Sequence, residues 1–306
     1  FVTSGIGVTV TGTVDLDALS TTISDTAVDL FVYDTRKDSD GGAWRKRTQH
    51  TSWYNETLGT ATRGARKEFP AVAVIVTTSS ALTIYDADDP NCSMWMVFVN
   101  DNAKWLKHTT SGPKAVVAMN GMVVSCGQGN AGRLSVVSFV SDDGYVTEAG
   151  YTYRHDWIAT RNSTAVGPTD TLNPRHIKNI NCNDVAITVL PNAPIDDDTG
   201  LPIPTIAVAT AGGTSIIKDN IHTYDHGYVA FDDDYNLIIG RNDGPILYGG
   251  PIPAADIVET SWRVQNDVTY FGDGGDVNVY NSTYDLGDTS ALTKNAFGYD
   301  TALGSL

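Results

Sequence analysis

The sequence predicts an all-β protein: a β-propeller-like array of repeated hairpins, with about six blades and an N-terminal extension strand. One observation is the acid content, because 32 of the 36 acidic residues are Asp and only 4 are Glu. Asp favours turns and caps, whereas Glu is a good helix former. A second is the abundance of strand and turn formers, with 36 Thr, 29 Val and 29 Gly. A third is a recurring unit of apolar strand, polar turn and apolar strand, repeated roughly every 40–45 residues. Two packed β-sandwich domains would give a similar census of strands and stay open as the alternative.

Residues 1–27 read as a separate N-terminal extension. Val8, Val10 and Val14 alternate with threonines, the period-two pattern of a strand with one buried face. A lone strand at a chain end must pair with a sheet, either of its own domain or of a neighbouring chain. We therefore expect these three valines to belong to an assembly strand, with an ordinary edge strand in the same chain as the alternative.

Residues 28–306 carry the repeated hairpins, with a polar insertion around 156–180. Asp38-Ser-Asp-Gly-Gly-Ala-Trp44 resembles the Asp-box hairpin of sialidase-like propellers, a folding element rather than a catalytic one, and predicts a turn between two strands. Turn residues between apolar runs predict each unit. In chain order the expected strands are 30–34 with 43–45, 71–76 with 82–85, 116–125 with 134–140, 184–190, 205–209 with 215–218, 228–231 with 236–239, and 268–271 with 277–280.

The charge distribution excludes some partners and suggests others. The net charge of −16 argues against general nucleic-acid binding, and no apolar run is long enough to predict a membrane span. The stretch 28–67 is the exception, since it holds 8 of the 20 basic residues together with Trp44, Trp53 and Tyr54. These aromatics are candidate contacts for a cell-surface glycan. The alternative is that the arginines pair with aspartates and the aromatics lie in the core.

Other candidate sites follow from residue type. Turn aspartates can supply oxygen ligands to Ca²⁺, and the candidate ligands are Asp273, Asp276, Asp38 and Asp40, with simple turn formation as the alternative. Four sequons make Asn55, Asn91, Asn162 and Asn281 candidate N-glycosylation sites. Cys92, Cys126 and Cys182 allow one disulfide with a free thiol, or three buried free thiols. No catalytic motif stands out, so we expect a protein that is not an enzyme and has no resident cofactor beyond a candidate Ca²⁺.

Two stretches resemble segments of large virion- or tail-associated proteins of aquatic bacteriophages, some of which lie next to laminin G-like lectin modules. One runs from Asp29-Leu-Phe-Val-Tyr-Asp34 to Met94-Trp-Met-Val-Phe98. The other runs from Asn183-Asp-Val-Ala-Ile-Thr-Val-Leu-Pro-Asn-Ala-Pro194 to Gly200-Leu-Pro-Ile-Pro-Thr-Ile-Ala-Val-Ala-Thr210. The resemblance implies a structural or host-contacting role on an extracellular particle or fibre, and it carries no catalytic residue.

Together these observations lead us to expect a non-enzymatic extracellular structural protein. It would be a repeating subunit of a self-assembling fibre or phage-type appendage, and its N-terminal strand would pair with a neighbouring copy of the same chain. A glycan-binding adhesin and a propeller-type glycoside hydrolase remain as alternatives.

Overall fold

The fold is taken from a computed structural model of the 306-residue chain. It describes residues 19, 25–101, 105–106, 112–128, 134–148, 151–163, 169–170 and 177–218, followed by the backbone of six short strands between 221 and 278. Several expected features lie outside the described residues: the assembly strand with Val8, Val10 and Val14, the candidate ligands Asp273 and Asp276, and the sequon at Asn281.

The described strands form five sheets, and every strand pair is antiparallel. The first sheet contains β1 (Asp29–Asp34), β2 (Val72–Thr77), β3 (Ala81–Asp86) and β4 (Met94–Val99). The second contains β5 (Pro113–Met119), β6 (Met122–Gly127), β7 (Leu134–Ser138), β8 (Asp143–Glu148), β9 (Tyr151–Asp156) and β10 (Thr169–Asp170). The third contains β11 (Cys182–Thr188), β12 (Thr205–Thr210), β13 (Gly213–Ile217) and β14 (Ile221–Tyr224). The last two contain β15 (Tyr228–Phe231), β16 (Leu237–Gly240) and β17 (Ile246–Gly250), then β18 (Tyr270–Phe271) and β19 (Val277–Asn278).

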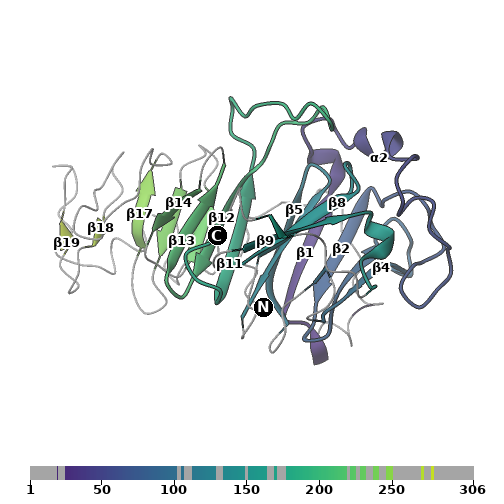
Figure 1. The fold of residues 1–306 in the computed structure, drawn as a ribbon, viewed down its shortest axis with the longest axis horizontal. Coiled ribbons are helices and arrows are strands. Elements are labelled where there is room, and N and C mark those ends of the chain that lie inside the picture. Colours follow the sequence, from purple (N-terminus) through teal and green to yellow (C-terminus); the bar gives the residue numbers. More distant parts are fainter. Residues whose placement is uncertain are drawn as a thin grey trace.

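The sheets follow one another in chain order, side by side (Figure 1). Within each of the first four sheets the strands are in sequential order, and the strand that comes first in the chain is an edge strand. These edge strands contact one another in succession, β1 with β5, β5 with β11 and β11 with β15. In a β-propeller the blades are arranged around a central channel, and the first strand of each blade lies next to the first strand of the following blade. The all-β, propeller-like prediction is therefore confirmed, although the described sheets do not close into a ring.

Two apolar layers hold the first three sheets together. Side chains alternate along β5, so Val116 and Ala118 face the first sheet while Ala115 and Val117 face the third. The layer between the second and third sheets is completed by Val124, Cys126, Leu134, Val136, Val185, Ile206 and Val208. Because the second sheet is buried on both faces, the fold is a row of sheets rather than two separate sandwiches.

A third apolar layer covers the outer face of the first sheet. Val74 and Val76 of β2 point away from the second sheet and are fully buried. Leu19, which is 4% exposed, packs in the same cluster, as do the half-buried Leu30 and Val32 of β1. Leu19 and Ala27, which precede β1 in the chain, therefore pack on the outer face of the first sheet.

The first two predicted hairpins belong to one sheet. For this reason the structure describes five sheets, whereas the sequence predicts about six blades. The run 43–45 does not form a strand, because it lies at the start of α2 (Trp44–Arg47), after the 3-10 turn η2 (Thr35–Lys37). β1 instead pairs with β2 across a 37-residue excursion, residues 35–71. The Asp-box-like segment is a turn that leads into α2 and not a turn between two strands, and Gly41 and Gly42 reverse the chain there with positive φ.

The run 116–125 is also not one strand. Asn120 and Gly121 have φ of 52° and 72° and form the tight turn between β5 and β6. Two successive residues with positive φ are the mark of a type I′ hairpin, which favours Asn-Gly. The predicted strand pairs 71–76 with 82–85, 205–209 with 215–218 and 228–231 with 236–239 are confirmed.

The loop between β11 and β12 crosses from the third sheet towards α2, at the top of Figure 1. Its Leu201 is buried in the core between the first and second sheets, and the carbonyl of Thr199 accepts a hydrogen bond from Arg47 Nη2 at 3.3 Å. Among the helical segments that the structure describes, none has the length and apolar character that crossing a lipid bilayer requires.

Candidate functional site

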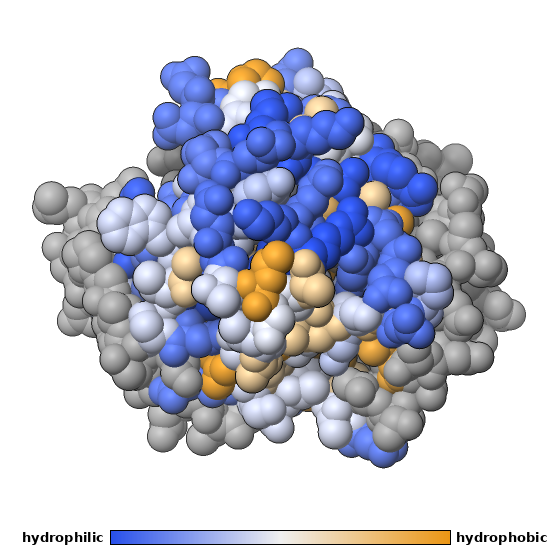
Figure 2. Space-filling model, turned by 90° about the vertical axis from the view of Figure 1, so that its right-hand side faces the viewer, coloured by the Kyte–Doolittle hydropathy of each residue, from blue (hydrophilic) through white to orange (hydrophobic). Residues whose placement is uncertain are grey.

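The arginines of the basic stretch are mostly engaged with acidic side chains. Arg36 Nε lies 2.7 Å from Asp34 Oδ1, and Arg66 Nη1 lies 2.9 Å from Asp86 Oδ2 and 2.8 Å from Asp88 Oδ2. Burial raises the pKa of Asp88, but the Ala71 N–H, Arg66 and the Val72 N–H together hold it below its usual value. The face at the β4 end of the molecule nevertheless has a broad hydrophilic area (Figure 2). The basic stretch therefore forms a polar surface whose positive charge is largely neutralised.

The aromatics of the same stretch correct the glycan-contact prediction. Trp44 and Trp53 have no exposed surface, and they pack in one cluster with Phe69, Trp95 and Phe139. Their ring nitrogens are used inside the protein, since Trp53 Nε1 donates to the carbonyl of Phe139 at 2.9 Å. Neither indole is accessible to a sugar.

Tyr54 is half-buried, packs against Trp53 and lies beneath Lys67, whose Nζ is 5.5 Å from the ring centroid. Of the three predicted glycan contacts it alone reaches the surface, and its ring face is occupied by a cation.

Asp38 is a structural carboxylate. It is 8% exposed, and its Oδ2 accepts hydrogen bonds from Tyr33 Oη at 2.6 Å and Trp44 Nε1 at 2.7 Å, while Oδ1 accepts from the Asn120 N–H at 2.8 Å. Tyr33 Oη in turn accepts from the Gly121 N–H at 2.7 Å. Burial raises the pKa of Asp38, and these donors oppose the rise. This network joins β1, the excursion and the β5–β6 turn.

The hydrogen bonds of Asp38 and Asp40 fit the alternative of simple turn formation, and the Ca²⁺ site stays a prediction. The three donors occupy both oxygens of Asp38, and Asp40 accepts from the Gly42 N–H at 3.0 Å and from Arg47 Nη1 at 2.9 Å. Donors on a carboxylate compete with a cation for the same lone pairs. In the described ranges no group of three or more His, Cys, Asp or Glu side chains is placed to hold a metal ion.

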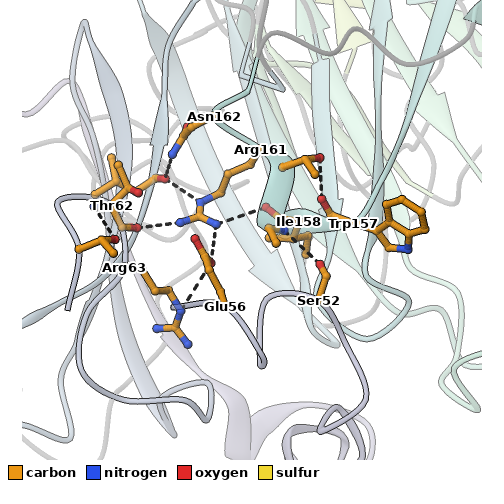
Figure 3. A network of polar contacts seen from close by, with 12 residues as sticks. Ser52, Glu56, Thr62, Arg63, Trp157, Ile158, Arg161 and Asn162 are labelled. Atoms are coloured by element: carbon orange, nitrogen blue, oxygen red, sulfur yellow. Dashed lines mark hydrogen bonds and ion pairs between the residues drawn. The ribbon is translucent and has the colours of Figure 1, made fainter. Parts of the chain in front are cut away.

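A second polar network lies on the other side of the same core, between the excursion and η3 (Ile158–Thr160) (Figure 3). Arg161 and Arg63 are almost completely buried, with side chains 1% and 0% exposed, and Glu56 lies between them. Arg161 Nη1 is 2.8 Å from Glu56 Oε2, and Arg63 Nε is 3.8 Å from the same oxygen. Burial lowers the pKa of Arg63 to about 10, with Glu56 opposing the shift and Arg161 adding to it. One carboxylate thus compensates two buried guanidinium groups.

This network closes the outer edge of β4. Trp95, Val97 and Val99 are the residues whose backbone groups point away from β3. The carbonyl of Trp95 accepts from the Gly64 N–H and from Arg63 Nη1, and that of Val97 accepts from Arg161 Nε and Asn162 Nδ2. The N–H groups of Val97 and Val99 donate to the Thr62 carbonyl and to Asn162 Oδ1. An edge strand with its polar groups occupied in this way offers no template for another strand.

The turn that carries Arg161 also presents an exposed indole. Trp157 is 64% exposed, and its side chain points away from the network in Figure 3. Its φ is +67°, and Asp142, which faces it, has a φ of +60°. Such backbone conformations cost a residue other than glycine about 1–3 kcal/mol and persist only when the surroundings impose them.

Asp142 supplies that constraint. Its carbonyl accepts from the Trp157 N–H at 2.8 Å and its Oδ1 from the Ile158 N–H at 3.0 Å. Ser52, in the excursion, donates to the same carboxylate from its N–H at 2.6 Å and from its hydroxyl at 2.8 Å. The indole is therefore held on a fixed turn rather than on a loose loop.

The three described sequons differ in accessibility. Asn55 Nδ2 donates to the carbonyls of Gln49 and Thr51, both at 2.9 Å, and the amide of Asn162 is bonded to β4. Asn91 is exposed, and its Nδ2 has only a long contact of 3.4 Å to Asp89 Oδ1. A glycan is attached through this nitrogen, so Asn91 offers the most accessible acceptor of the three.

All three cysteines are buried free thiols, which is one of the two expected arrangements. Cys126 and Cys182 lie in the layer between the second and third sheets, and Cys92 lies beneath the segment before β1. Burial, followed by contact with Cys182, raises the pKa of the Cys126 thiol.

Trp157 and Arg161 were not predicted from sequence. Both lie in the stretch assigned to an insertion, and nothing in their spacing indicates a site. For Trp157 the available signal is its position as a tryptophan within a polar segment. For Arg161 the sequence carries no signal, because nothing in it distinguishes a buried arginine from an exposed one.

Comparison with known proteins gives no family. No family model matches the chain, and no curated protein matches it. A search of solved structures finds an auxiliary nutrient binding protein from Bacteroides thetaiotaomicron, with 9% identity, 58% of each chain covered and a TM-score of 0.25. It also finds the WD40 domain of Neurospora crassa Pan2, with 9% identity, 61% of this chain and 74% of that chain covered, and a TM-score of 0.22. The WD40 β-propeller domain of Doa1 matches with 10% identity, coverage of 67% and 84%, and a TM-score of 0.23.

Proposed function

We propose that the protein is a non-enzymatic extracellular structural subunit, which assembles into a fibre or phage-type appendage by exchanging its N-terminal segment between neighbouring copies. The observation that carries the proposal is the outer face of the first sheet. Val74 and Val76 make this face apolar, and Leu19 covers it from the segment that precedes β1.

A terminal segment that covers an apolar face can be exchanged at little cost. The same contacts form whether the segment comes from its own chain or from a neighbour, so exchange loses no buried surface. Exchange in one direction along a row of copies is a head-to-tail contact, and it generates a linear assembly when the rotation between copies does not close a ring. The alternating valines of residues 8–14 would extend the exchanged segment beyond Leu19.

The sealed edge of β4 restricts where the exchanged segment can bind. Because Arg63, Arg161 and Asn162 occupy the outward backbone groups of β4, a donated strand gains no ladder there. The apolar face of the first sheet is the acceptor in this proposal, and side-chain burial rather than strand pairing at β4 drives the exchange.

The test compares the full chain with a variant that lacks residues 1–14 and with Leu19→Asp. In negative-stain microscopy and sedimentation velocity, the full chain is expected to form linear assemblies at high concentration. Both variants are expected to remain folded monomers, because the truncation removes the valines that extend the exchanged segment and the carboxylate of Leu19→Asp resists burial on the apolar face of a neighbour. Ile203→Asp is the matched control, since Ile203 is an exposed hydrophobic residue on the β11–β12 loop. A truncated chain that still polymerises, or a full chain that stays monomeric, would refute the proposal.

A further inference from the structure

We propose that Trp157 is the stacking platform of a binding site for neutral glycans. The other exposed large hydrophobic residues in the described part of the chain are Val28, Ile195 and Ile203, and none of them is aromatic. Trp157 is also the most exposed of the four, at 64%. Tryptophan is enriched at binding surfaces because its indole combines a large apolar face with an N–H donor, so this side chain is the place to look for a ligand.

The platform is rigid before any ligand arrives. Trp157 adopts a left-handed backbone conformation that the hydrogen bonds of Asp142 impose, and its own carbonyl accepts from the N–H and the hydroxyl of Thr160, both at 2.9 Å. Strained, over-determined positions of this kind gather at ligand contacts, because a backbone that is already held in place loses little entropy on binding.

The surroundings of Trp157 indicate what the ligand is. Exposed Arg154 and Asp156 alternate with buried His155 on β9, the strand that leads directly into Trp157. Asp143 is the cross-strand neighbour of Asp156 on β8. A single indole beside polar and charged groups lacks the contiguous apolar area that protein partners use. It suits a pyranose ring, which lays its C–H face on the indole and offers hydroxyl groups to the polar side chains.

Charge selects the class of glycan. Among the described residues around Trp157, two carboxylates and one guanidinium give a negative balance of charge, in a chain of net charge −16. Uronic acids, sialic acids and phosphorylated sugars are repelled by such a surface. Neutral hexose polymers are not, and they are the ligands we assign to the site. The assignment is independent of assembly, because Trp157 lies on the turn after β9 and not on the exchanged segment.

The experiment is affinity electrophoresis of the full chain in native gels that contain a soluble polysaccharide. Neutral probes are a β-1,3-glucan, a galactomannan and dextran, and polygalacturonate is the anionic probe. At least one neutral polymer is expected to retard the wild-type protein. Trp157→Ala should weaken the apparent affinity at least about tenfold and Trp157→Tyr much less, because an aromatic face remains. Ile195→Ala, at a residue 58% exposed, is the matched control and should behave as wild type. Retardation by polygalacturonate alone, no retardation by any neutral probe, or an unchanged Trp157→Ala variant would each overturn the assignment.

A second variant separates lost binding from lost folding. Trp157→Gly removes the indole and at the same time suits the left-handed backbone, which glycine adopts without strain. Its melting temperature should therefore equal or exceed that of the wild type, while retardation by the neutral polymer disappears. A Trp157→Gly variant that is stable and still retarded as wild type would also overturn the assignment.

Discussion

Arg161 and Glu56 form a buried ion pair, and we expect the losses of unfolding free energy from replacing each residue alone to be strongly non-additive. In Arg161→Met the side chain keeps much of its volume but loses four hydrogen bonds, to Val97, Thr62, Ile158 and Glu56. The three carbonyls are not left unpaired, because Asn162 Nδ2, the Val97 N–H and the Arg161 N–H still donate to them. At a net of about 0.5–1.5 kcal/mol for each of these bonds, plus the ion pair, we expect a loss of about 3–4 kcal/mol.

Glu56→Gln should cost at least as much. It leaves two guanidinium groups, Arg161 and Arg63, buried without an anion, and breaking a buried pair from one side typically costs about 3–5 kcal/mol. In the double variant the ion pair is lost only once, and a single buried cation remains. We therefore expect the sum of the two single-variant losses in unfolding free energy to exceed the loss in the double variant by about 1.5–3 kcal/mol.

The assay is chemical unfolding followed by circular dichroism, with the slope of the transition checked in each variant. Arg47→Met is the matched control. Its partner is Asp40, and because the Arg47 side chain is 47% exposed, the loss should stay below about 1 kcal/mol. Additivity of Arg161→Met and Glu56→Gln within about 0.5 kcal/mol would refute the reasoning, since the two side chains would then not share an interaction.

Three further predictions concern the core and its turns. Asp38→Asn should destabilise the fold by about 2–3 kcal/mol in denaturant titrations, because its amide group must face either the Trp44 or the Asn120 N–H donor. The pKa of Asp38 is raised in the folded state, so just above pH 3.8 the folded state binds more protons than the unfolded state. Wild type should therefore lose stability relative to Asp38→Asn as the pH rises through the folded pKa. A stability difference that does not depend on pH would contradict this. Gly121→Ala should lower the melting temperature more than Gly59→Ala, although both have positive φ, because the added methyl group of the former meets Val140 Cγ2 at 2.5 Å and the latter has open space. Cys92, Cys126 and Cys182 should not react with a thiol reagent until the protein unfolds, and three equivalents released from the native state would show that they are accessible.

The sequence was sufficient for the strands whose pattern is local. Hairpins such as β2–β3 and β12–β13 join alternating runs through short turns, so period and turn chemistry place both strands. The pairing of β1 with β2 was missed because the partner lies beyond a 37-residue excursion, and glycines at 41 and 42 imitate a hairpin turn. The Asn120-Gly121 turn was overlooked inside an apolar run, although it carried the strongest local signal for a hairpin.

The candidate sites were harder to predict, because burial decides what an aromatic or an arginine does. Trp44 and Trp157 are the same residue type in polar segments, yet one has no exposed surface and the other is 64% exposed. The difference arises from tertiary contacts. Trp44 donates to a buried carboxylate, whereas the backbone of Trp157 is turned outward by Asp142, a residue 15 positions earlier. No pattern of spacing contains that information.

One short turn serves both the sealed edge and the exposed indole. Residues 157–162 are attached to β4 through the side chains of Arg161 and Asn162. They are also attached to Asp142, which directly precedes β8, and to Ser52 of the excursion. The Ile158 carbonyl accepts from Arg161 Nη1, so the two attachments meet within one turn of 3-10 helix. Loosening the first attachment should therefore loosen the second. Arg161→Met, which keeps the indole, should weaken glycan retardation as well as stability, whereas Arg47→Met should leave retardation unchanged and cost less than about 1 kcal/mol of stability. If Arg161→Met lost stability but bound neutral glycan as wild type, the turn would be rigid without its anchor on β4, and Asp142 alone would be sufficient to position Trp157.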